Sequence, residues 1–284
     1  MTIQHETHTI QGYDNTQLFV QSWLPGPAST SALVLAHGIG EHSGRYAHVA
    51  EFLAGHGMAV YAVDHRGHGQ SAGGRGHIEH FEEYVDDFEL FFEFVRAQQA
   101  DTPLVCLGHS MGSLIALLFT ARRQDDLAAL VLSGTALYIG GTNAVTRFVI
   151  KLANCIIPQW KIVPPIAPEL VSRDPEVIER YTRDPLNNSG PMRPRQIVEL
   201  MRGGKASANV LPQIHIPVLA LHGGADQLTL IAGAERVRSH CGAADKTLKI
   251  YDGLRHEVFN EPEKETVLND LAAWLAERGL LEWP

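Results

Sequence analysis

Residues 104–113 read LVCLGHSMGS, and this stretch decides the fold. Leu104–Leu107 is a short apolar run typical of a buried strand, and an apolar helical pattern covers Met111–Arg123. Between them, residues 108–112 match G-x-S-x-G, in which a serine occupies a sharp turn from a strand into a helix. The flanking glycines are needed because side chains there would collide with the strand and the helix. Ser110 is therefore the predicted nucleophile, at the carboxyl end of a strand.

The same alternation of apolar runs and helical patterns continues on both sides of this turn. The predicted strands are Ala32–Ala36, Met58–Asp64, Leu104–Leu107, Ala129–Ser133, Val218–Leu221 and Thr247–Tyr251. The predicted helices are Arg45–His56, residues 80–98, Met111–Arg123, Ile231–Cys241 and Glu263–Arg278. Strands that alternate with helices favour an α/β fold, with a mostly parallel central sheet and helices on both faces. His8–Ile10 and Leu18–Trp23 alternate apolar and polar residues, which predicts an antiparallel hairpin at the sheet edge.

The alternation stops in a proline-rich stretch with short helical patches. We interpret residues 136–212 as an inserted cap, and residues 1–135 with 213–284 as the core, because the stretch lies between two predicted strands and is rich in apolar side chains. Those side chains include Phe148, Val149, Ile150, Ile156, Ile157 and Trp160. We expect them either to pack against the core or to line a tunnel for an apolar chain. An exposed apolar face of the cap would instead contact micelles or membranes.

The composition is that of a globular protein. Of the 284 residues, 45% are hydrophobic and 19% are charged, and the net charge is 23 − 32 = −9. An acidic chain is poorly suited to bind nucleic acid.

The three scattered cysteines, Cys106, Cys155 and Cys241, predict buried thiols in a reducing compartment. With no signal-peptide pattern at Met1–Gly12 and no predicted transmembrane segment, we expect a cytoplasmic protein that is peripheral at membranes.

A serine hydroxyl needs a general base, and in this type of fold the order along the chain is serine, acid, histidine. Asp226 and His256 follow the last two predicted strands, where such residues are expected. His222 precedes the acid and so has the wrong order, and Asp252 lies only four residues before His256, which suits a turn. The sequence therefore predicts a triad of Ser110, Asp226 and His256.

A tetrahedral intermediate also requires two backbone N–H donors. One is expected at Met111, directly after the nucleophile, and the other at Ile39, in the glycine-containing loop at residues 37–40. Both donors are main-chain groups, so the side chains of these two residues are not the acting groups.

The remaining polar clusters in the sequence do not match a metal-binding or phosphate-binding motif. The nearest histidine pairs, His65 with His68 and His77 with His80, lack the spacing of a zinc motif, and no phosphate-binding glycine motif is present. We therefore expect neither a metal nor a cofactor. Acidic residues between 82 and 89 are expected on the solvated face of their helix.

Several motifs in register resemble the monoacylglycerol lipase family of the α/β-hydrolases, in the serine aminopeptidase S33 or hydrolase 4 group. The motifs are HGIGEHSGRY at 37–46, DHRGHGQSAG at 64–73, GHSMGS at 108–113 and HEVFNEPE at 256–263. In the cap, SRDP at 172–175 and YTRDPL at 181–186 resemble bacterial members. The resemblance extends from about residue 12 to 278, and between Tyr138 and Pro168 no motif matches.

The resemblance implies a serine esterase that cleaves monoacylglycerols into fatty acid and glycerol without a cofactor. It assigns the triad to Ser110, Asp226 and His256, and the oxyanion hole to Ile39 and Met111. It also implies that the glycerol head lies near Arg45, His109 and Tyr181. Lysophospholipase or general carboxylesterase activity is the main alternative. A peptidase, an acyltransferase and a non-catalytic binding protein are further alternatives.

Overall fold

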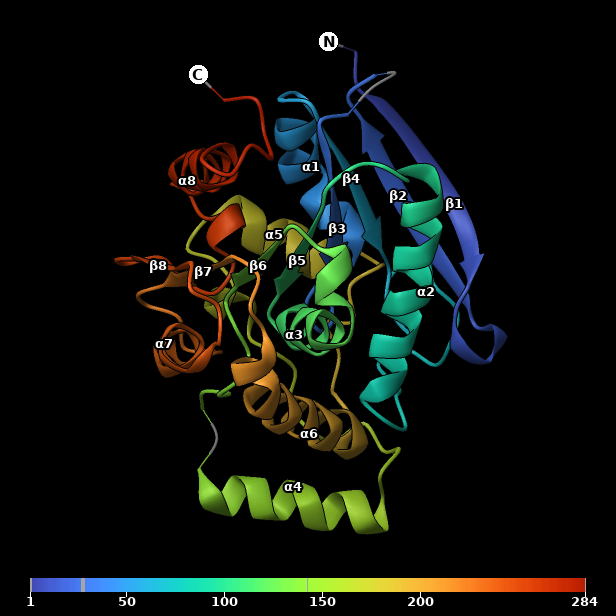
Figure 1. Ribbon diagram of the computed structural model, residues 1–284. Coiled ribbons are helices and arrows are strands. Elements are labelled where there is room, and N and C mark those ends of the chain that lie inside the picture. Colours follow the sequence, from blue (N-terminus) through green and yellow to red (C-terminus); the bar gives the residue numbers. More distant parts are fainter. Residues whose placement is uncertain (1, 27–28, 142, 284) are drawn as a thin grey trace.

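The computed structural model describes residues 2–26, 29–141 and 143–283, so the first and last residues of the predicted core lie outside it. Its centre is an eight-stranded sheet in the order β1-β2-β4-β3-β5-β6-β7-β8 (Figure 1). The strands are β1 (Gln4–Gln11), β2 (Gln17–Leu24), β3 (Ser31–Ala36), β4 (Met58–Val63), β5 (Leu104–His109), β6 (Ala129–Ser133), β7 (Val218–Gly223) and β8 (Lys246–Tyr251). The helices are α1 (Ala47–Ala54), α2 (Glu82–Gln98), α3 (Met111–Arg123), α4 (Ala144–Ile156), α5 (Pro175–Arg183), α6 (Pro194–Val210), α7 (Ile231–His240) and α8 (Lys264–Ala276).

The strand directions confirm the predicted sheet. β1 and β2 form an antiparallel hairpin, β2 is antiparallel to β4, and all the other pairings in the sheet are parallel. Parallel strands end at the same edge, so the loops after β3, β5, β7 and β8 meet there. That edge is where the predicted nucleophile, acid and base are brought close together.

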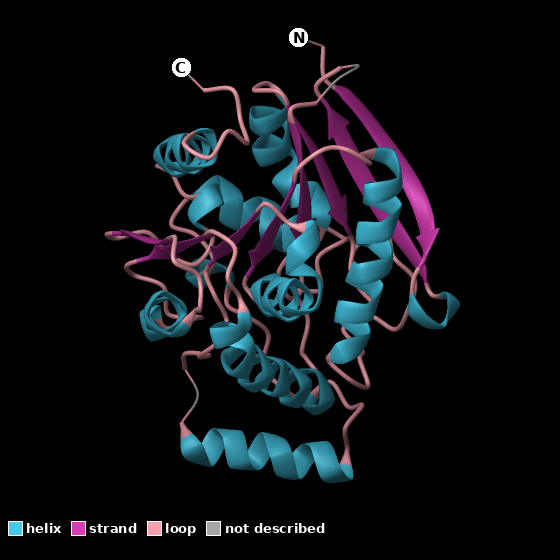
Figure 2. Cartoon of the chain, viewed as in Figure 1, coloured by secondary structure: helices cyan, strands magenta, loops and turns pink. Residues whose placement is uncertain are grey.

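Helices cover both faces of the sheet, which explains why its central strands are continuous apolar runs (Figure 2). Leu33 and Leu35 of β3 pack with α1 and α8. Val34 and Ala36, which point the other way, pack with α2 and α3. Successive side chains of one strand thus enter two separate cores.

The predicted cap contains longer helices than the short patches expected from its proline content. α4, α5 and α6 all lie between β6 and β7, and α4 and α6 span 13 and 17 residues. Pro175 and Pro194 occupy the first positions of α5 and α6. Proline is favoured there because its fixed φ suits the first turn and its missing N–H is not needed. These prolines begin helices and do not interrupt them.

Most apolar side chains of α4, and Trp160 in the loop after it, are exposed, against the expectation that they pack on the core or line a tunnel. α4 lies at the far edge of the molecule, with α6 between it and α3 (Figure 1). Phe148, Ile156 and Trp160 are 66%, 70% and 65% exposed, whereas Ile150 is buried against α6. No helix was predicted at residues 144–156, where only short helical patches were expected, and most of the apolar surface of α4 faces outward. None of the helices in the described ranges is long and apolar enough to cross a membrane.

Two smaller expectations were also wrong. Cys106 and Cys241 are buried thiols as predicted, but Cys155, on α4, is exposed. Asp87 was placed on the solvated face of α2, yet it is buried because Nε and Nη2 of Arg66 donate to its carboxylate at 2.6 and 2.8 Å.

Candidate active site

Ser110 occupies the turn between β5 and α3, and its backbone is strained. Its φ is +52° and its ψ is −118°, a conformation that residues with a side chain rarely adopt. The neighbouring glycines permit the turn: a Cβ at Gly108 would lie 2.3 Å from the carbonyl oxygen of Gly112, and one at Gly112 would lie 2.0 Å from that of Ala36. The predicted turn is therefore present, with Ser110 at the carboxyl edge of the sheet.

His256 and Asp226 lie in the loops after β8 and β7 and are hydrogen-bonded to each other. His256 Nδ1 is 2.8 Å from Asp226 Oδ2. The same carboxylate accepts backbone N–H bonds from Leu228 and Thr229, at 2.8 and 3.0 Å, and the Thr229 hydroxyl at 2.7 Å. Both side chains are buried, so the imidazole is held in one orientation.

These contacts set the charges of the pair. Burial opposes the charge on Asp226, but His256 and Thr229 outweigh burial and hold the pKa of this carboxyl well below its ordinary value. Burial also disfavours charge on His256, yet the Asp226 carboxylate outweighs it and raises the pKa of His256 above its ordinary 6.5. Such a pair suits a base that must carry a proton briefly and then return it.

Ser110 and His256 border one small cavity with Ile39 and Tyr181. Its volume is only ≈ 20 Å³, room for about one water molecule. Within the described part of the chain, the Ser110 hydroxyl makes no hydrogen bond to His256. Catalytic hydrogen bonds are often long before the substrate binds and tighten in its complex.

The two predicted oxyanion donors lie next to Ser110. Ile39 borders the cavity, and Met111 is the first residue of α3. Among the described residues, neither backbone N–H donates a hydrogen bond to the protein. Two unpaired N–H groups beside a serine can stabilise negative charge on a reacting oxygen.

Arg45, His109 and Tyr181, which the family resemblance assigns to the polar head, are brought together. The Arg45 guanidinium lies 4.9 Å from the centre of the Tyr181 ring, and the His109 ring lies 4.7 Å from that of His256. His109 and Tyr181 both border the cavity. Burial, helped by the nearby His256, lowers the pKa of His109 to about 4, so it is neutral at pH 7.

Sequence reasoning missed Glu41 and Glu257, which hold Arg45 in place. Arg45 Nη1 donates to Glu41 Oε2 at 2.7 Å, and its Nη1 and Nη2 donate to the two Glu257 oxygens at 2.5 and 2.6 Å. Glu41 and Glu257 stand inside two of the quoted motifs, and that was the available signal. No local pattern could have shown that they share one arginine.

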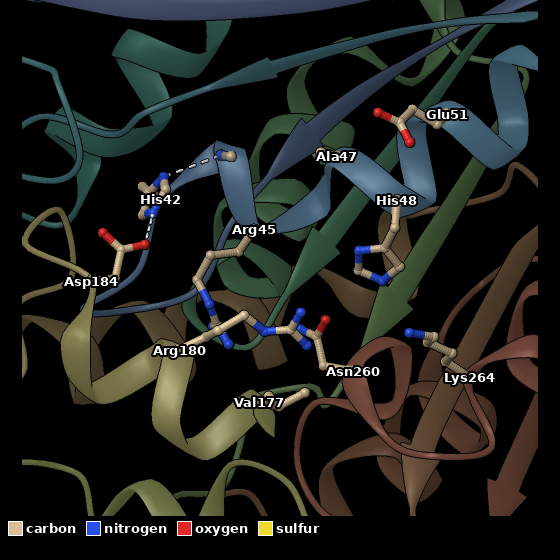
Figure 3. A pocket seen from close by; sticks show the side chains of 11 residues that line it. His42, Arg45, Ala47, His48, Glu51, Val177, Arg180, Asp184, Asn260 and Lys264 are labelled. Carbon is tan, nitrogen blue, oxygen red and sulfur yellow. Dashed lines mark hydrogen bonds and ion pairs between the residues drawn. The ribbon is translucent and has the colours of Figure 1, made fainter. Parts of the chain in front are cut away.

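A second, larger pocket is lined in part by Arg45 (Figure 3). Its volume is ≈ 400 Å³, and polar side chains of α1, α5 and the start of α8 line it. His42 Nε2 is 2.9 Å from Asp184 Oδ2 at one end, and Arg180, Asn260 and Lys264 lie toward the other. Most residues that line this pocket are charged or polar, whereas Ile39, Ile166 and Leu228 are among those that border the cavity at Ser110.

Comparisons with known proteins agree with this geometry. The sequence profile of the family described as serine aminopeptidase, S33, matches residues 27–263. A monoacylglycerol lipase of Mycolicibacterium smegmatis is 36% identical over 94% of this chain and 96% of its own length. The human monoglyceride lipase is 32% identical over 93% of this chain and 88% of its own length.

The fold comparison gives the same picture. The crystal structure of a monoacylglycerol lipase from Paleococcus ferrophilus superposes with a TM-score of 0.80 at 28% identity, covering 98% of this chain and all of that one. The likeness confirms the predicted α/β-hydrolase fold.

Proposed function

The chain belongs to the serine aminopeptidase S33 family of hydrolases, and from this premise we propose that it cleaves the ester bond of monoacylglycerols to a fatty acid and glycerol. It is a carboxylic ester hydrolase of the monoacylglycerol lipase type. The observation that carries the proposal is the buried pair of His256 and Asp226 beside Ser110, with two unpaired N–H groups at Ile39 and Met111.

The proposed reaction has two halves. In the first, Ser110 Oγ attacks the ester carbonyl carbon while His256 Nε2 accepts the hydroxyl proton, and the Ile39 and Met111 N–H groups bind the resulting oxyanion. The carbon–oxygen bond to glycerol breaks, and His256 returns the proton to the departing glycerol oxygen. In the second half, His256 takes a proton from a water molecule that attacks the acyl carbon; the bond between this carbon and Ser110 Oγ then breaks, His256 returns the proton to Ser110 Oγ, and the fatty acid is released. Asp226 keeps the imidazole in the required tautomer and stabilises its charged form.

The polar head of the substrate is proposed to lie near Arg45, His109 and Tyr181. His109 and Tyr181 border the Ser110 cavity, and Arg45 lies against Tyr181 and also lines the larger polar pocket of Figure 3. The Arg45 guanidinium is already bound by two carboxylates, so its role toward glycerol is limited to its remaining N–H donors.

Fatty-acid release from four substrates tests the proposed function against its main alternatives. Monooleoylglycerol, dioleoylglycerol, trioleoylglycerol and lysophosphatidylcholine are compared at equal acyl concentration. We expect monooleoylglycerol to give the highest kcat/KM. A preference for lysophosphatidylcholine would replace the proposal with lysophospholipase activity. Cleavage of short synthetic esters alone would leave a general carboxylesterase.

We further propose that residues 136–212 act as a cap whose exposed helix α4 contacts lipid surfaces. Phe148 and Ile156 of α4 and Trp160 in the loop after it expose apolar area, and α4 carries Arg147 and Lys151 but no acidic residue. Apolar side chains combined with basic ones suit an anionic lipid–water interface. The cavity at Ser110 is too small for an acyl chain, so the cap or its loops must shift for substrate to enter.

The double substitution Phe148→Ser/Ile156→Ser should weaken binding to vesicles of phosphatidylcholine and phosphatidylglycerol by about tenfold or more, because each buried apolar side chain contributes about 1.5–3 kcal/mol. Flotation of vesicles with bound protein measures the effect. Hydrolysis of a monomeric short-chain ester should stay unchanged, while hydrolysis of micellar monooleoylglycerol falls. The matched control is Leu90→Ser/Ile250→Ser, which removes two exposed apolar side chains outside the cap. Equal vesicle binding by both double variants would argue against a lipid-binding role for α4.

A further inference from the structure

Glu41 is a buried carboxylate attached to the loop that carries the predicted oxyanion donor. Its side chain is 3% exposed. Oε1 accepts the Gly38 N–H at 2.6 Å and the Tyr46 hydroxyl at 2.7 Å, and Oε2 accepts Arg45 Nη1 at 2.7 Å. A carboxylate so close to a site that must stabilise an oxyanion works against catalysis electrostatically, unless it is neutralised. We therefore expect a structural role of Glu41 that offsets this electrostatic cost.

The hydrogen bonds on either side of Ile39 indicate that role. The Gly38–Ile39 peptide carries the Ile39 N–H, and its carbonyl oxygen, that of Gly38, lies 2.7 Å from His37 Nδ1. In a trans peptide the C=O and N–H point in opposite directions, so fixing this carbonyl also fixes the direction of the Ile39 N–H. Glu41 holds the preceding N–H, that of Gly38. The loop contains two glycines, and Gly40 has a φ of +76°, so without such anchors it has wide conformational freedom.

Arg45 extends the same network to the loop of the general base. Its guanidinium binds Glu41 and, through two hydrogen bonds, Glu257. Glu257 directly follows His256, 212 residues away from Arg45 along the chain. Burial opposes the charge on Glu257, but the Arg45 guanidinium outweighs it and lowers the pKa of this carboxyl, so the ion pair persists at neutral pH. The guanidinium also offsets the negative charge of Glu41.

We propose that Glu41 is a positioning residue that orients the oxyanion donor at Ile39, and that Arg45 and Glu257 tie this donor to the loop of His256. The proposal rests on the proposed function for the roles of Ile39 and His256. Glu41 does not touch substrate. It acts through the Gly38 N–H, and the reach of its side chain, more than its charge, is what the geometry requires.

Two substitutions separate the effect of the length of the Glu41 side chain from the effect of its charge. Glu41→Gln keeps an oxygen at the position that accepts the Gly38 N–H, but it removes the charge and, by placing an NH2 group in the position of Oε2, also removes the hydrogen bond from Arg45 Nη1. Glu41→Asp keeps the charge beside Arg45 but withdraws the oxygen by about one carbon–carbon bond, roughly 1.5 Å. Loss of a whole oxyanion donor costs on the order of a hundredfold to a thousandfold in kcat. We expect Glu41→Asp to lower kcat by on the order of tenfold to a hundredfold and Glu41→Gln to stay within about threefold of wild type. KM should change little in either variant.

The matched control is Tyr46→Phe, which removes the other hydrogen bond to Glu41 Oε1 and leaves that from Gly38. Its kcat should remain within about threefold of wild type. All rates are divided by the number of active sites titrated with an alkyl fluorophosphonate, so partial unfolding does not enter kcat. A trifluoromethyl ketone, which forms a tetrahedral adduct with the serine, should lose affinity in Glu41→Asp in parallel with kcat/KM.

The reverse order, with Glu41→Asp active and Glu41→Gln impaired, would overturn the proposal, because charge and not reach would then matter. Unchanged ketone affinity in Glu41→Asp would overturn it as well. The kinetics are measured on both monooleoylglycerol and a soluble p-nitrophenyl ester. If wild type cleaves only the soluble ester, the lipid assignment fails while the ester kinetics still decide the role of Glu41.

Discussion

Ser110→Ala is expected to lower kcat for monooleoylglycerol by on the order of a millionfold, as removing the serine of such a triad does in other serine hydrolases. The reason is the loss of the only atom proposed to form the acyl-enzyme. Ser110 occupies the strained turn at the carboxyl end of β5, which the close approaches at Gly108 and Gly112 permit. The measurement is oleate release under substrate saturation, compared with the rate without enzyme.

The folded state of the variant is checked by its thermal unfolding curve. Ser239→Ala, at an exposed serine on α7, serves as the control and should keep wild-type activity. An active Ser110→Ala protein, with more than trace turnover, would remove Ser110 from the mechanism.

Asp226→Asn is expected to lower kcat by on the order of ten thousandfold, the cost typical of replacing a triad acid with its amide. The amide can donate a hydrogen bond to His256 Nδ1, which would favour the tautomer that carries the proton on Nε2. That nitrogen could then no longer accept the Ser110 proton. The matched control is Asp252→Asn, in the loop after β8, which should stay within about threefold of wild type because Asp252 is exposed and, among the described residues, makes no hydrogen bond or ion pair with Asp226 or His256.

Asp226→Asn should also change the pH dependence of kcat/KM. His256 acts as a base only when neutral, and its pKa in the wild type is raised above 6.5 chiefly by Asp226 acting against burial. Wild-type kcat/KM should therefore fall with decreasing pH through a midpoint above 6.5. In Asp226→Asn the negative charge that opposes the effect of burial is lost, so the pKa of His256 should fall. The midpoint of the residual activity should therefore move to lower pH. An unchanged midpoint, or a large loss in Asp252→Asn, would contradict the assignment of Asp226 as the acid.

Most of the sheet could be predicted because the signal is local. The central parallel strands are buried on both faces, so runs such as Ala32–Ala36 and Ala129–Ser133 stand out as continuous apolar segments. The position of Asp226 and His256 followed from a rule of chain order together with the strands that precede them. Local pattern and fold agree in these regions.

Other features depend on contacts that local pattern does not contain. The stripe of apolar residues on α4 has the same helical spacing whether it faces a core or solvent, so the exposure of Phe148 could not be read from it. Asp87 is buried because Arg66, 21 residues away, pairs with it. The bridge of Glu41 to Glu257 through Arg45 spans more than two hundred residues. Only the folded chain shows these pairings.

The most direct test of the central claim is covalent labelling with a long-chain alkyl fluorophosphonate, which reacts irreversibly with an activated serine. The protein is incubated with the reagent with and without monooleoylglycerol, and intact and peptide masses are recorded. We predict one added group per chain, on the peptide that contains Ser110, and slower labelling when monooleoylglycerol is present. Labelling at another residue, no labelling at all, or a rate unaffected by monooleoylglycerol would contradict a monoacylglycerol hydrolase that acts through Ser110.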